Sequence, residues 1–112
     1  AVQQADAAAG SQKVNMMWVD VDGCVSAPQY CKYFITSVQK GIVAAVSTAV
    51  TGTANGSFKG GNYIGTLANG GVALAPYHDF ESKIPTALQN EVAGLKAGIV
   101  DGSIKIATKS PV

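Results

Sequence analysis

The segment that most constrains the fold is residues 14–23, a short apolar run that ends in two aspartates and a glycine. Its length, its flanks and its lack of a helical period favour a buried strand of a parallel sheet. Asp20 and Asp22 would lie at the carboxyl end of this strand, with both side chains on one face if the strand continues through them. Ligands of such sheets bind beyond the carboxyl ends of the strands, so we expect a site here.

Strand and helix signals alternate along the rest of the chain. Predicted strands, rich in β-branched, aromatic or apolar residues, occupy residues 33–36, 62–67, 72–75 and 103–107. Predicted helices occupy residues 1–9, a stretch capped by Ser37 and a stretch capped by Ser82. Asn69-Gly70 is a hairpin signal, and Gly10 is suited to end the first helix. This alternation predicts an α/β fold with a mostly parallel sheet covered by helices.

Residues 30–50 allow two interpretations. One is a single long helix, and the other is a strand at residues 33–36 followed by a helix that Ser37 caps. We favour the second because aromatic and β-branched residues fill the strand. It places Lys40 in the first helical turn, where the helix dipole disfavours a cation. A lysine there requires an acceptor, and Asp20 is the candidate.

Composition excludes several classes of function. The 112 residues form one domain at most, 47% of them are hydrophobic, and the net charge is +1. Disorder is excluded because it requires low hydrophobicity and high net charge. Nucleic-acid binding is not expected, because the chain has no basic excess and its eight cations are all lysines. No apolar run is long enough to span a bilayer.

The residues with potential chemistry outside the two aspartates are Cys24, Cys31 and His78. The cysteines lack the spacing of a redox pair, and they either form a disulfide or remain as two buried thiols. Zinc would require both cysteines, His78 and a carboxylate to converge, and structural zinc sites usually have closer spacings, so we expect no metal and no cofactor. A hydrolase would require His78 to lie near Asp20 or Asp22, and the chain lacks a nucleophile elbow.

Four stretches, in this order, resemble the basic membrane protein family of extracytoplasmic solute receptors, which includes purine nucleoside receptors of ABC importers. They are residues 19–22 (VDVD), 36–40 (TSVQK), 60–76 (GGNYIGTLANGGVALAP) and 96–106 (KAGIVDGSIKI). Together they span nearly the whole chain but match only the C-terminal third of the family. The sequence departs from the family pattern at Trp18, where glycine is expected, at Gly23, where glutamine is expected, and in the Cys24–Cys31 loop.

The resemblance implies that residues 1–112 are the C-terminal third of a two-lobed, type I periplasmic-binding-protein-like fold. Strands near residues 33–38 and 62–75 would then cross the hinge between the lobes. It also implies a protein of the periplasm or a lipoprotein of the cell surface, which works with the membrane permease of an ABC importer and is not an enzyme. The part of the family upstream of residue 1 would carry the lipoprotein signal and a glycine-rich ligand loop.

The resemblance further implies that Asp20 and Lys40 contact the ribose of a nucleoside, with Asp22 as a weaker candidate. A carboxylate acceptor beside an ammonium donor satisfies a sugar diol, whose hydroxyls both donate and accept. The leading hypothesis is therefore a solute-binding module. The alternatives are a small hydrolase that uses Asp20 or Asp22 with His78, and a structural fragment that self-associates through exposed sheet edges.

Overall fold

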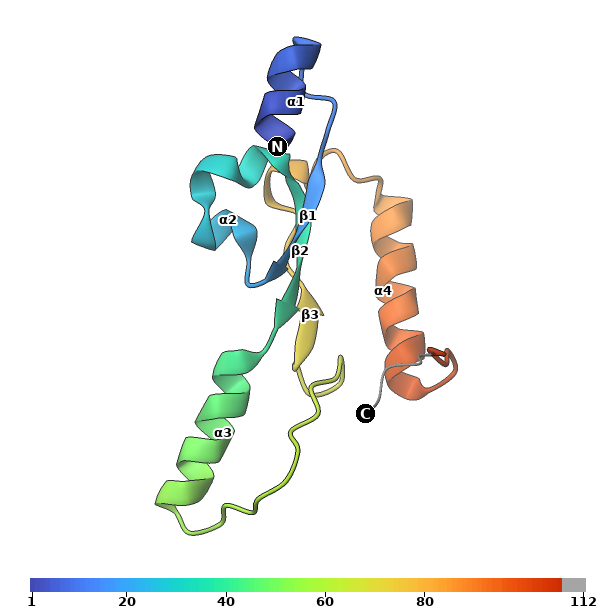
Figure 1. The fold of residues 1–112 in the computed structure, drawn as a ribbon. Coiled ribbons are helices and arrows are strands. Elements are labelled where there is room, and N and C mark those ends of the chain that lie inside the picture. The colour runs from blue at the N-terminus through green and yellow to red at the C-terminus, as the bar shows by residue number, and fades with distance from the viewer. Residues whose placement is uncertain (108–112) are drawn as a thin grey trace. The chain divides into compact units, whose positions relative to one another are not determined.

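The computed structural model describes residues 1–107, and Figure 1 shows its elements in chain order. They are α1 (Val2–Ala9), β1 (Met16–Asp20), α2 (Gly23–Ser26), the 3₁₀ helix η1 (Pro28–Tyr33), β2 (Phe34–Lys40), α3 (Ile42–Ala54), β3 (Val72–Leu74), the 3₁₀ helix η2 (His78–Phe80) and α4 (Thr86–Asp101). None of the described helices is both long and apolar enough to cross a membrane.

The chain divides into two compact units. The first comprises Ala1–Gln39 and Leu74–Thr86, and the second comprises Lys40–Ala73 and the described residues from Ala87 onward. The chain passes from one unit to the other within β2, within β3 and at the start of α4.

The sheet has three strands in the order β1-β2-β3. β1 and β2 are parallel, and their register pairs Trp18 with Ser37 and Asp20 with Gln39. The Trp18 ring lies 5.1 Å from the Phe34 ring, centroid to centroid. The expected first strand is therefore confirmed, but it is not buried on both faces, because Val19 is 55% exposed.

The core of the first unit combines aromatic residues with hydrogen-bonded hydroxyls. Its buried hydrophobic side chains are Tyr33, Phe34, Ala75 and Phe80. Thr36, which is buried in β2, donates its hydroxyl to the Ala75 carbonyl at 2.7 Å. Burying a hydroxyl costs little folding free energy when it has such a partner. The Thr36–Ala75 bond therefore fixes where β2 and the chain around Ala75 meet.

Ser37 lies inside β2 and does not cap a helix, which corrects the prediction for this segment. Its buried Oγ accepts a hydrogen bond from the Gly23 N–H at 3.0 Å, so it is not available as a cap. The helix begins at Ile42 instead, with Gly41 as its N-cap residue. Lys40 is consequently the last residue of β2, not part of the first helical turn.

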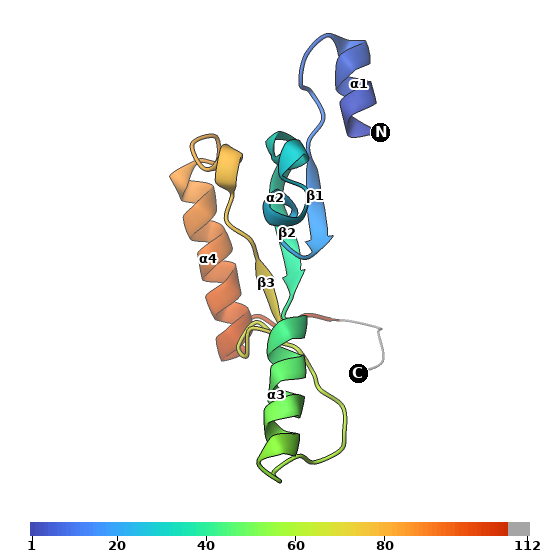
Figure 2. The same cartoon turned by 90° about the vertical axis from the view of Figure 1, so that its left-hand side faces the viewer.

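The hairpin prediction for residues 62–75 is also wrong in part. Only Val72–Leu74 forms a strand, and Figure 2 shows a long connection between α3 and β3 without helix or strand. Asn69 organises that connection with its side chain: its Oδ1 accepts from the Thr66 and Gly71 N–H groups, and its Nδ2 donates to the Ile64 carbonyl. A side-chain-centred turn thus replaces the ladder of a hairpin.

Two further boundaries differ near the C-terminal end of the described chain. α4 begins at Thr86, after Pro85, and Ser82 lies in the preceding turn. Residues 103–107 form no strand, and the Ile104 N–H donates back to the Gly98 carbonyl at 2.9 Å. Hydrogen bonds from Ser103, by its side chain first and its backbone second, lower the pKa of Asp101 below its usual value.

Much apolar surface is exposed in the described residues. α3 buries none of its residues, and Val43, Val46 and Val50 on this helix are 81%, 56% and 62% exposed.

The first helix agrees with the sequence prediction: Gly10 ends α1 with a φ of 66°, a left-handed conformation that glycine adopts without a steric penalty.

Gly23 is the glycine whose replacement should cost most in the first unit. A Cβ at this position would lie 2.7 Å from the Phe34 ring and 2.8 Å from the Trp18 ring. We expect Gly23→Ala to lower the free energy of unfolding by about 1–3 kcal/mol through overpacking. Gly94→Ala on α4 is the matched control, because its Cβ would meet no atom within 4 Å, and it should stabilise by about 0.5–1 kcal/mol. Urea denaturation of both variants tests this, and equal effects would contradict the packing.

Candidate functional site

Asp20 ends β1 in a backbone conformation that few non-glycine residues adopt. Its φ is 76°, in the left-handed region, where aspartate and asparagine are enriched among non-glycine residues. The strand therefore does not continue through Asp22, so the condition under which both carboxylates would lie on one strand face is not met. Such conformations cost about 1–3 kcal/mol and cluster at functional sites, so Asp20 deserves its place among the candidates.

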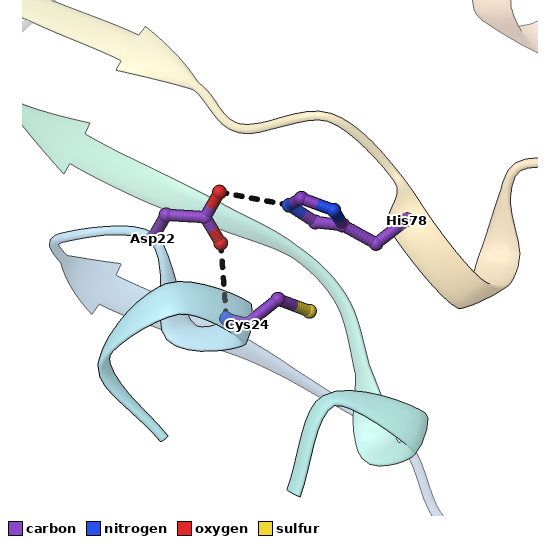
Figure 3. A group of neighbouring side chains, drawn as sticks. All are labelled: Asp22, Cys24 and His78. Atoms are coloured by element: carbon purple, nitrogen blue, oxygen red, sulfur yellow. Dashed lines mark hydrogen bonds and ion pairs between the residues drawn. The ribbon is translucent and has the colours of Figure 1, made fainter. Parts of the chain in front are cut away.

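Asp22 begins α2 as its N-cap and holds His78 at the same time. One carboxylate oxygen, Oδ1, accepts from the Cys24 N–H at 3.0 Å, and Oδ2 lies 2.8 Å from His78 Nε2, as Figure 3 shows. The Asp22 side chain is 13% exposed and the His78 side chain 31%. The carboxylate thereby joins two segments that are far apart in the sequence and keeps His78 in one orientation.

His78 is positioned by the chain that leaves β3. The Ala75 N–H donates to the Ser37 carbonyl at 2.9 Å, and buried Phe80 anchors the following 3₁₀ turn. His78 itself has a φ of 47°, and its carbonyl accepts from the Glu81 N–H at 3.0 Å. These contacts fix the backbone at His78, and the Asp22 carboxylate then orients the imidazole.

Cys24 and Cys31 form a disulfide, one of the two alternatives that the sequence left open. The bond links α2 to η1, which contact each other. Together with Asp22 and His78, Cys24 belongs to a group whose potential metal-ligand atoms all lie within 4.8 Å of one another. Because its sulfur is in a disulfide, Cys24 offers no thiolate, and the described residues present only a carboxylate and an imidazole here.

Lys40 is exposed and lines a groove of about 310 Å³ in the second unit. Tyr63 and Gly71 are among the other lining residues. An ammonium group beside an aromatic ring can bind a polar ligand that also carries a flat or apolar part. The sequence identified Lys40 as a candidate but not the groove that it lines.

The sequence did not predict that Asp22 and His78 form a pair. Their separation of 56 residues is bridged by β2 and β3, whose pairing no local pattern reveals. The hydrolase and zinc hypotheses both required a carboxylate close to His78, and this requirement was the sequence signal for the pair. The structure brings His78 to Asp22, and the group of potential metal ligands in the described residues consists of Asp22, Cys24 and His78, without Asp20.

Comparison with solved structures identifies the fold. The chain is similar to a structure described as that of ABC transporter system solute-binding proteins from Aeropyrum pernix K1, with a TM-score of 0.77 and 23% sequence identity. The match covers 98% of this chain and 36% of that chain, so this chain spans about a third of the length of its structural relative. No protein-family model and no curated protein matches the sequence.

The comparison confirms the predicted fold class. The chain is a mixed α/β fold of the periplasmic-binding-protein-like kind, with a three-stranded sheet in which β1 and β2 pair in parallel. At 23% sequence identity, this similarity establishes the fold alone, and the function depends on the residues of the site.

Proposed function

We propose that this chain is part of an extracytoplasmic solute receptor of an ABC importer and that it binds a nucleoside through Asp20 and Lys40. The observation that carries the proposal is the end of the parallel β1–β2 pair. Asp20 ends β1 opposite Gln39 in the register, and Lys40 is the next residue along β2. The carboxyl ends of parallel strands are where ligands bind in open α/β sheets, and a carboxylate with an ammonium group suits a ribose diol.

Three features support the wider role. The fold is shared with solute-binding proteins over 98% of this chain. β2 and β3 both pass from one compact unit to the other, as strands that cross a hinge would. The chain spans 36% of its relative, and α3 exposes its apolar side chains, which fits a segment that packs against more protein in a longer receptor. The same proposal places the receptor in the basic membrane protein family, gives it a lipoprotein anchor and pairs it with the permease of an ABC importer.

The test is a calorimetric titration of the full-length gene product that carries these 112 residues. We expect a purine nucleoside to bind at least about 100-fold more tightly than the matching free base, because two hydrogen bonds between charged groups and the ribose contribute about 1.5–3 kcal/mol each. Equal affinity for nucleoside and base would contradict the roles of Asp20 and Lys40. Tight binding of a different class of solute would support the role as a solute receptor and overturn the proposed nucleoside specificity.

A hydrolase is the second candidate, favoured by the 2.8 Å contact between His78 and Asp22. In general-base catalysis by histidine, an aspartate bonded to the imidazole orients the ring, as Asp22 does for His78. Incubation of the protein with nucleosides, followed by product analysis, separates the two functions. A hydrolase predicts free base and sugar from the wild type and none from His78→Ala, whereas the receptor predicts no product from either.

A further inference from the structure

We propose that the Cys24–Cys31 disulfide masks a zinc site formed by Asp22, Cys24 and His78, which reduction of the disulfide opens. The candidate ligand atoms, a carboxylate oxygen, a sulfur and an imidazole nitrogen, already lie within 4.8 Å of one another (Figure 3). Zn²⁺ binds this combination of oxygen, nitrogen and sulfur, whereas Mg²⁺ and Ca²⁺ require mainly oxygen ligands.

Three hydrogen bonds position Cys24 in addition to the disulfide. The Cys24 N–H donates to Asp22 Oδ1 at 3.0 Å, and the Gly23 N–H donates to the buried Ser37 hydroxyl at 3.0 Å. The Ala27 N–H closes the turn onto the Gly23 carbonyl at 2.8 Å. The Gly23–Ser37 bond ties α2 to β2, and the other two bonds hold the turn of α2 itself, so we expect a free Cys24 thiol to stay beside Asp22.

The remaining two ligands are held and accessible. The Asp22–His78 contact of 2.8 Å shows that Oδ2 and Nε2 point at each other, and a metal ion would replace the hydrogen bond between them. Asp22 Oδ1 would keep its bond to the Cys24 N–H and orient the carboxylate from outside the metal site. The exposed 31% of the His78 side chain gives an ion a path from solvent. Three protein ligands leave the fourth tetrahedral position to water.

The chemistry balances with a dithiol as reductant. The dithiol transfers two electrons and two protons to the disulfide, which yields two thiols, and it becomes a cyclic disulfide. On metal binding, the Cys24 thiol releases its proton to solvent. A neutral His78 releases none, because it binds the ion through Nε2 and carries its one proton on Nδ1. Cys31 takes no part in the site, because its role is to hold the Cys24 sulfur in the masked form.

Two single-cysteine variants of the whole chain test the proposal without a reductant. Both Cys31→Ser and Cys24→Ser lose the disulfide and retain one thiol, so they match in every respect except which sulfur is free. We expect Cys31→Ser to bind Co²⁺ with a thiolate charge-transfer band and to bind Zn²⁺ at least about 10-fold more tightly than Cys24→Ser. Adding His78→Ala to Cys31→Ser should abolish that difference.

Equal zinc affinity of the two cysteine variants, or Co²⁺ binding without a thiolate band, would overturn the proposal. If loss of the disulfide unfolds the variants, far-UV circular dichroism with and without Zn²⁺ gives the answer, because binding to the folded state restores folding. Recovery in Cys31→Ser alone supports the site, and recovery in neither variant or in both contradicts it.

Discussion

Replacing Asp20 with glycine is expected to weaken nucleoside binding by about 100-fold in the full-length receptor. The loss follows from the proposed carboxylate–ribose contact, because truncation leaves a buried hydroxyl without its acceptor, at a cost of about 1–3 kcal/mol. Glycine adds no backbone strain at this position, because it adopts the φ of 76° readily. Isothermal calorimetry measures the affinity and thermal denaturation measures the stability.

Glu91→Ala is the matched control for Asp20→Gly. It removes the same charge from an exposed residue on α4 and should leave the nucleoside affinity within about twofold of the wild type. If Asp20→Gly binds nucleoside as tightly as Glu91→Ala does, then Asp20 does not contact the ligand.

Removal of the Cys24–Cys31 disulfide is expected to lower the free energy of unfolding by about 2–3 kcal/mol, on the chain-entropy relation for a short closed loop. For a chain of this size that corresponds to a fall in Tm of about 10 °C. The cross-link spans seven residues and joins α2 to η1 in a unit with few buried hydrophobic side chains, so the structure has little to compensate for its loss.

Thermal denaturation of the Cys24→Ser/Cys31→Ser double variant measures this cost, with Ser26→Ala as a control of similar size on the same short helix. An unchanged Tm in the double variant would show that the hydrogen bonds of Asp22, Gly23 and Ala27 alone fix the loop. The double variant is also the reference for zinc binding without a thiol ligand, because it has neither cysteine.

The sequence predicted most of what local patterns determine. The apolar run before Asp20 gave β1, and the alanine-rich opening with Gly10 gave α1 and its end. The α/β class followed from the alternation of these signals, and the fold comparison confirms it. In each case the residues that define the element are neighbours in the chain.

The predictions that failed depended on tertiary partners. Ser37 has the composition of a cap, but the Gly23 N–H occupies its hydroxyl, and β2 extends to Lys40. Residues 62–67 have the composition of a strand, but the Asn69 side chain binds the backbone of this segment instead. The Asp22–His78 pair likewise follows from the way β3 returns beside β2, which spacing along the chain does not encode.

The central claim is that Asp20 and Lys40 bind the hydroxyls of a sugar, and a double-mutant cycle between protein and ligand tests it most directly. Calorimetry would compare wild type and Asp20→Gly, each titrated with a purine nucleoside and with its 2′,3′-dideoxy analogue. We predict that the dideoxy analogue binds the wild type about 100-fold more weakly than the nucleoside but binds Asp20→Gly only about 10-fold more weakly, because Lys40 still contacts the sugar, a coupling of about 1.4 kcal/mol. Equal losses in the two proteins would show that Asp20 does not recognise the sugar hydroxyls and would contradict the account.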